Sequence, residues 1–120
     1  MGLRHLAREA ALQAMYACDF SDTWNIEKCE FCFEHFSMTK PARVYATEIC
    51  KEMIVHLKEI DETISEISQN WSLSRMSRVD RNILRISTYE LLYTETPVNV
   101  VINEAIEIAK DFGTNDSPKF

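Results

Sequence analysis

The apolar residues between positions 53 and 71 recur at a spacing that buries them all on one side of an α-helix. The series follows intervals of four and three residues, and its members are Met53, Leu57, Ile60, Ile64, Ile67 and Trp71. An α-helix has about 3.6 residues per turn, so this spacing keeps one face apolar over several turns, whereas a strand would alternate the residues between two faces. We therefore expect a long, core-facing helix here, with Asp61 as the place where it could break.

The rest of the chain offers few signals for anything other than helices. Only two glycines and three prolines occur in 120 residues, so the tight turns that join β-strands are scarce. A chain of this length with 46% hydrophobic residues can bury one core. The sequence predicts an all-α protein in which residues 1–120 form a single compact domain.

Further helices are bounded by local start and stop signals. We expect helices over residues 3–20 and 26–36, and from Pro41 onward. Ser77 and Asp80 have the spacing of a capping box that opens the next helix, and Asn99 is expected to cap one that ends at Gly113. The residues predicted to face inward on these last two helices are Val79, Ile83, Leu84, Ile86, Leu91, Val101, Ile102, Ala105, Ile108, Ala109 and Phe112.

The last residues contain the beginning of another helix. Ser117 followed by Pro118 has the pattern of an N-cap and a first-turn proline, and the sequence stops two residues later at Phe120. We interpret this as a domain that lacks the C-terminal helix expected after Phe120.

Four cysteines raise the alternatives of a disulfide or a metal site. Cys29-x-x-Cys32-x-x-His35 offers zinc ligands, but no second pair completes a tetrahedral cage, and the same spacing places these residues on neighbouring turns of one helix. With no export signal and an apolar core, the cysteines are expected to be free thiols. The sequence predicts no bound metal and no cofactor.

The composition also argues against an enzyme and against a membrane protein. We find no glycine-rich phosphate loop and no nucleophile elbow, and the carboxylates Glu59, Asp61, Glu62 and Glu66 are typical of a solvated helix face. No apolar run approaches the roughly 18 residues of a membrane span, and the N-terminus lacks a signal peptide. We expect a cytoplasmic protein without catalytic residues.

The net charge of −6 disfavours a nucleic-acid partner, but the basic residues are concentrated locally. Residues 71–85 contain one acidic residue, Asp80, and four basic ones, Arg75, Arg78, Arg81 and Arg85. Two further arginines, Arg4 and Arg8, lie near the N-terminus. Salt confines the field of a charge to about 8–10 Å, so a basic patch can act on an acidic protein.

Two blocks of sequence, V-D-R-N-I-L-R-I-S-T-Y-E-L at 79–91 and I-N-E-A-I-E-I-A-K-D-F-G at 102–113, resemble the signature blocks of the NusB family of transcription antitermination factors. The N-terminal A-R-E-A-A-L-Q-A-M-Y, I-D-E-T-I and Trp71 are similar to other parts of that family. The resemblance implies a helical fold of two packed subdomains. It also implies binding of single-stranded boxA-type RNA together with NusE, a small-subunit ribosomal protein, in an antitermination complex on RNA polymerase during ribosomal RNA transcription. Family members usually continue past Phe120 with V-N-G-V-L and a closing helix.

The same resemblance suggests which residues contact RNA. Arg4, His5 and Arg8 lie on one helical face that suits phosphates and bases, although a solvated helix end has the same pattern. Lys119 is expected to contact phosphate and Phe120 to stack on a base, with a core role for Phe120 as the alternative. Lys110 is a further basic candidate that could instead complement the helix dipole.

For NusE, the resemblance points to Asp80, flanked by Arg75 and Arg78. Asp80 could also serve only as a helix-capping residue. We expect Arg81 and Arg85 to pair with Glu90 or Glu104 inside the bundle, because an unpaired buried guanidinium is very costly.

Two other functions remain open from the sequence. One is the NusB-like RNA-binding domain that precedes some ribosomal RNA cytosine methyltransferases, although no cofactor-binding domain follows here. The other is a helical protein-interaction module that makes no RNA contact.

Overall fold

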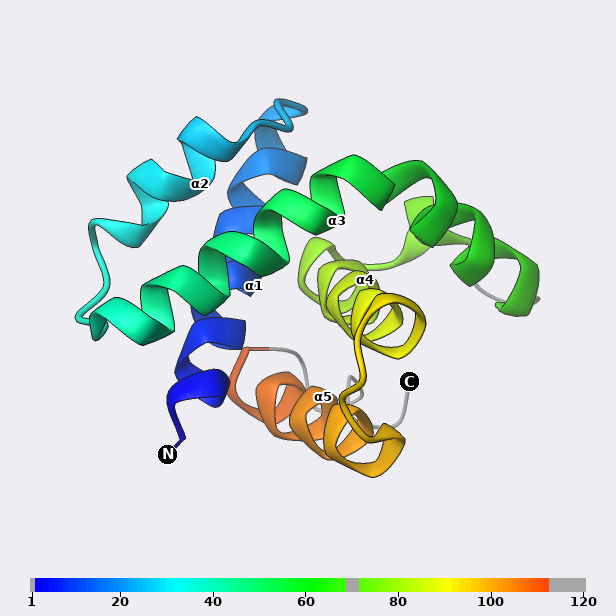
Figure 1. Cartoon of the computed structure of the whole chain (residues 1–120). Helices are drawn as coiled ribbons and strands as arrows, with labels where there is room; N and C mark the ends of the chain where they lie inside the picture. Colours follow the sequence, from blue (N-terminus) through cyan, green and yellow to red (C-terminus); the bar gives the residue numbers. More distant parts are fainter. Residues whose placement is uncertain (1, 69–71, 113–120) are drawn as a thin grey trace. The chain divides into compact units, whose positions relative to one another are not determined.

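The computed structural model describes residues 2–68 and 72–112, and these ranges contain helices and no strand. The helices are α1 (Leu3–Ser21), α2 (Ile26–Phe33), α3 (Lys40–Ile67), the 3-10 helix η1 (Leu73–Arg75), α4 (Arg78–Tyr93) and α5 (Val98–Phe112), as Figure 1 shows. The all-α prediction is confirmed. Trp71, Gly113, Ser117, Pro118, Lys119 and Phe120, which the sequence analysis singled out, lie outside the described residues.

The chain forms two compact helical units, as the resemblance implied. The first comprises Met1–Val55 and the second His56–Phe120, so α3 contributes its first turns to one unit and its last turns to the other. The expected break in α3 near Asp61 is wrong, because the helix runs without interruption to Ile67. No helix in the described ranges has both the length and the apolar character that a membrane span requires.

Small residues line the buried face of α1 in the first unit. Ala7, Ala10, Ala11 and Ala14 are fully buried on α1, and α1 packs against α2. Small side chains on a buried helix face allow neighbouring backbones to approach closely, which increases dispersion contacts. The first helix ends at Asp22, whose φ of 52° places it in the left-handed region that aspartate tolerates better than most residues.

Three cysteines from α1, α2 and α3 meet in the core of this unit. Cys18, Cys29 and Cys50 are fully buried, and the Sγ atoms of Cys18 and Cys29 lie 3.8 Å apart. The hydrogen bond with Cys29, followed by burial, raises the pKa of Cys18. At Cys29 the bond with Cys18 lowers the pKa, but the bond with Cys50 together with burial outweighs it, so the pKa is raised. All four cysteines are free thiols, and these three pack as apolar core residues.

In the second unit, α4 packs against α5 and begins at the predicted cap. The Ser77 hydroxyl accepts a hydrogen bond from the backbone N–H of Asp80 at 3.0 Å, which satisfies one of the free donors of the first turn. The predicted cap at Asn99 is wrong, because α5 already begins at Val98 and the Pro97 carbonyl accepts from Val100 and Val101.

The buried face of this unit differs from the predicted one at three apolar positions. Leu91, Ile102 and Ile67 are 44%, 49% and 75% exposed. On α4 the buried face instead includes polar side chains, its members being Asn82, Ile83, Arg85, Ile86, Tyr89 and Glu90. These residues together occupy one side of α4, and Leu91 lies outside that side.

A buried ion pair joins the last turns of α3 to α4. The Arg85 side chain is 8% exposed, and its Nε donates to Asp61 Oδ1 at 2.8 Å while Nη2 donates to Asp61 Oδ2 at 3.0 Å. A further hydrogen bond runs from Arg85 Nη1 to Asn82 Oδ1 at 3.0 Å. The prediction that Arg85 pairs internally is confirmed. However, the carboxylate that receives this fork is Asp61, which the sequence analysis assigned to a solvated face.

Removing the Asp61 carboxylate leaves a buried guanidinium without its bidentate partner. We expect Asp61→Ala to lower the free energy of unfolding by about 2–4 kcal/mol, somewhat less than for a fully buried pair because Asp61 is 28% exposed. Urea unfolding followed by circular dichroism measures this change. The neighbouring Glu62→Ala, at an exposed position of the same helix, is the control and should shift stability by less than about 0.5 kcal/mol. Equal stabilities of the two variants would contradict this role of the ion pair.

A second contact between α3 and α4 depends on pH. The Tyr93 hydroxyl donates to Glu59 Oε2 at 2.5 Å, and the His56 ring stacks on the Tyr93 ring with centroids 4.2 Å apart. The hydrogen bond to Glu59 raises the pKa of Tyr93. Because the raised pKa favours the neutral phenol in the folded state, this stabilisation is present below the ordinary tyrosine pKa of about 10 and is lost as pH rises through the folded value.

We expect Tyr93→Phe to lose less stability than the wild type as pH is raised from about 9 to about 11. Urea titrations at several pH values measure the difference, with Tyr16→Phe on α1 as the control for removing an exposed phenol. Parallel stability curves for the wild type and Tyr93→Phe would show that the hydrogen bond with Glu59 does not depend on the protonation of Tyr93.

Candidate nucleic-acid interface

The N-terminal end of α1 carries the basic residues that the sequence analysis assigned to RNA. The helix has no acidic residue in its first turn, and Gly2 provides no side-chain cap. Arg4 is exposed, whereas Arg8 is only 3% exposed. Cationic side chains at this end oppose the helix dipole, so the position favours an anion as the compensating group.

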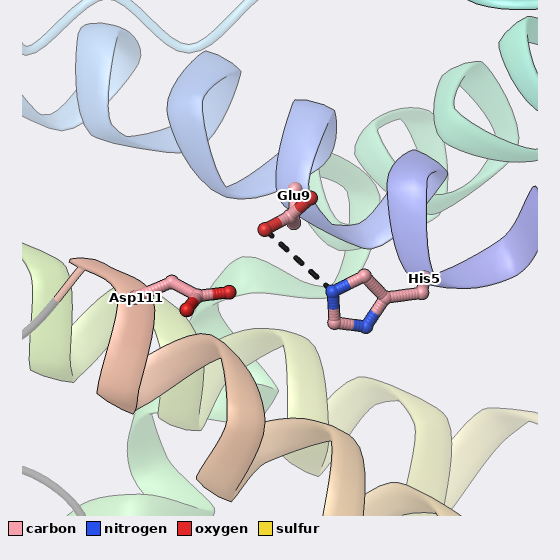
Figure 2. A group of neighbouring side chains, drawn as sticks. All are labelled: His5, Glu9 and Asp111. Carbon is pink, nitrogen blue, oxygen red and sulfur yellow. Dashed lines mark ion pairs between the residues drawn. The ribbon is translucent and has the colours of Figure 1, made fainter. Parts of the chain in front are cut away.

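His5 lies close to a carboxylate one turn along the same helix. Its Nε2 is 3.6 Å from Glu9 Oε2, and the two side chains are 11% and 13% exposed (Figure 2). Among the three predicted basic residues of α1, Arg4 is therefore the one with a broadly accessible side chain.

A tyrosine that sequence reasoning missed completes this end of the unit. The Cζ atom of Arg4 lies 5.3 Å from the ring centroid of Tyr45, and Cζ of Arg8 lies 5.9 Å from the same centroid. Both distances fall within the range of cation–π attraction. Tyr45 belongs to α3, about 40 residues away along the chain, and no local spacing relates it to the arginines.

Lys110, the remaining described candidate for RNA contact, lies in the last turn of α5. Its Nζ is 3.4 Å from Glu107 Oε1, and both side chains are more than half exposed. An exposed pair of this kind contributes little to stability, and its position also suits the negative end of the helix dipole.

The residues assigned to NusE surround the beginning of α4. Asp80 is half-buried and lies in the first turn, where a carboxylate complements the helix dipole. Arg78 and Arg75 are exposed on either side of the Ser77 cap. Arg81 donates from Nη1 to the Leu73 carbonyl at 3.3 Å, which ties η1 to α4.

The residues of the zinc alternative have other neighbours in the structure. Cys29 faces the buried thiols of Cys18 and Cys50, while the exposed His35 packs edge-on against Phe31. Burial raises the pKa of Cys32. These surroundings favour protonated thiols over the thiolates that bind zinc.

Comparison with known proteins places this geometry in a family. The NusB family model matches residues 5–120. The transcription antitermination protein NusB of Geobacter sulfurreducens is 44% identical, over all of this chain and 88% of its own length. NusB of Lysinibacillus sphaericus is 42% identical over 98% of this chain and 89% of its own length.

Solved structures show the same fold. T. maritima NusB superposes with a TM-score of 0.87 at 36% identity, over the whole of this chain and 84% of its own. A crystal structure of antitermination factors NusB and NusE in complex with double-stranded RNA matches with a TM-score of 0.87 at 25% identity, over the whole of this chain and 90% of its own. With a family model that covers nearly all of the sequence and relatives above 40% identity, this chain belongs to the NusB family.

Proposed function

We propose that this protein is a transcription antitermination factor that binds boxA-type RNA together with NusE, as part of a processive complex on RNA polymerase during ribosomal RNA transcription. The observation that carries the proposal is the exposed Arg4 guanidinium at the N-terminal end of α1, in a chain related over its full length to NusB antitermination proteins. A relative of the same fold has been crystallised with both NusE and RNA.

On the RNA side, Arg4 contacts phosphate or stacks on a base, and Arg8 and His5 support it from the next positions of the same helix. Arginine suits both tasks because its planar guanidinium donates several hydrogen bonds and stacks on rings. Lys110 contributes a second phosphate contact by giving up its weak pair with Glu107. Lys119 and Phe120 complete the proposed set on the strength of the family resemblance alone.

On the protein side, Asp80 contacts a basic surface of NusE, with Arg78 and Arg75 at its edge. The helix cap uses the backbone N–H of Asp80 and the hydroxyl of Ser77, so it leaves the Asp80 carboxylate available to a partner. Asp80 can therefore take part in the N-terminal cap of α4 through its backbone and face NusE through its side chain.

The proposed function is tested by titrating boxA-type RNA and a scrambled RNA with the protein at fixed salt, with and without NusE. We expect selective binding of the boxA sequence that tightens when NusE is present. Arg4→Gln should weaken it about tenfold, because a charge-assisted hydrogen bond contributes about 1.5 kcal/mol. Lys51→Gln, at an exposed position of α3, makes the same charge change and should have little effect.

Each contrary outcome of this titration identifies a different function. Binding of NusE without any RNA effect would indicate a protein-interaction module. Equal affinity for boxA and scrambled RNA, with and without NusE, would contradict the adaptor role.

Asp80→Asn should weaken NusE binding about tenfold, because a close charge pair at an interface contributes about 1.5 kcal/mol or more. The cap persists, since the backbone N–H of residue 80 is unchanged, and only the dipole interaction of about 0.3–1 kcal/mol is lost from stability. Isothermal titration calorimetry with NusE measures the affinity. Glu95→Gln, an exposed acid beyond the end of α4, is the matched control. If both variants bound NusE like the wild type, Asp80 would be a capping residue only.

A further inference from the structure

We propose that Tyr45 is a positioning residue of the RNA surface, whose ring holds the guanidiniums of Arg4 and Arg8 together at the N-terminal end of α1. This inference rests on the proposed function, because it assigns a role to Tyr45 in the same RNA contact. The contact itself is made by Arg4, and Tyr45 acts through it.

The geometry is confined to the first unit. Tyr45 lies one turn into α3 and is half-buried, while Arg4 and Arg8 lie one turn apart on α1. The two Cζ atoms are 5.3 Å and 5.9 Å from the Tyr45 ring centroid. Arg8 is almost fully buried and Arg4 is exposed, so the ring links a fixed cation to an accessible one.

The Arg4 cation lies in the first turn of α1, at the positive end of the helix dipole, and this turn has no acidic residue. The negative face of the Tyr45 ring attracts the Arg4 guanidinium without neutralising its charge. A carboxylate in the place of the ring would hold Arg4 equally well, but it would also repel phosphate.

The charge of Arg4 therefore stays available to a ligand. Within residues 2–68 and 72–112, the Arg4 guanidinium has the Tyr45 ring as its contact and no carboxylate in an ion pair. Lys110, by contrast, is paired with Glu107, and Arg85 with Asp61. The contact with Tyr45 restricts the long Arg4 side chain before RNA binds. Less conformational entropy is therefore lost when the complex forms.

The proposal is tested with Tyr45→Leu and Tyr45→Phe, each alone and combined with Arg4→Gln, using the boxA titration over a range of salt concentrations with NusE present. Tyr45→Leu removes the ring and should weaken RNA binding about two- to fivefold, the range expected of an exposed cation–π contact. Tyr45→Phe keeps the ring face and should bind like the wild type. In the Arg4→Gln background, Tyr45→Leu should have a clearly smaller effect, since the group that it positions is gone.

A purely structural role of Tyr45 gives a different pattern. Tyr45→Leu would then lower stability in urea unfolding and weaken RNA binding by the same factor whether residue 4 is Arg or Gln, and that result overturns the proposal. Should Tyr45→Leu fail to fold, Tyr45→Met, which keeps a long apolar side chain without a ring, replaces it. If Arg4→Gln weakens binding and neither ring-less variant does, only the role of Tyr45 is wrong. If Arg4→Gln binds like the wild type, the proposed RNA surface fails as well.

Discussion

The burial of the Arg85 charge is the constraint on which the second unit depends. A guanidinium that is 8% exposed requires a carboxylate in good geometry, and the fork to Asp61 supplies two hydrogen bonds from two nitrogens. This pair sets which face of α4 packs toward the last turns of α3. Since Asp80 lies on the same helix, the side of α4 on which it lies is fixed relative to Arg85. The block V-D-R-N-I-L-R therefore combines a residue that fixes the helix with one that can face a partner.

The first unit solves a different problem, because it must pack tightly and still present cations at one end. Four fully buried alanines give α1 a small buried face, and the thiols of Cys18, Cys29 and Cys50 meet between α1, α2 and α3 without exposing a polar group. The same helix carries Arg4 ahead of this apolar stretch and Arg8 directly after its first alanine. Their contact with Tyr45 connects the end of α1 to α3, so packing and charge are arranged by one pair of helices.

Local features of the fold could be predicted from the sequence, whereas features that depend on distant residues could not. The helical class, the long helix from Pro41 and the Ser77 cap follow from spacing and from groups within one turn of each other. The exposure of Leu91 and Ile67 and the pairing of Arg85 with Asp61 depend on which helix lies opposite, which no periodicity encodes. At the candidate site, Arg4, His5 and Arg8 were recognisable as neighbours on a helix. Tyr45 was not, because its relation to them exists only in the folded chain.

The overall charge of −6 and the local basic groups act over different distances. Beyond a Debye length of about 8–10 Å the acidic surface is screened, so it neither attracts nor strongly repels RNA. Within that distance the sign of the nearest groups decides, and in the first turn of α1 these include Arg4, whose guanidinium contacts the uncharged Tyr45 ring. A surface with so few cations neutralises few phosphates, which limits both its affinity and its salt dependence. Under the proposed function, strong and selective binding would therefore come from contacts that a partner adds beside Arg4, which gives a physical reason for an acidic adaptor to need NusE.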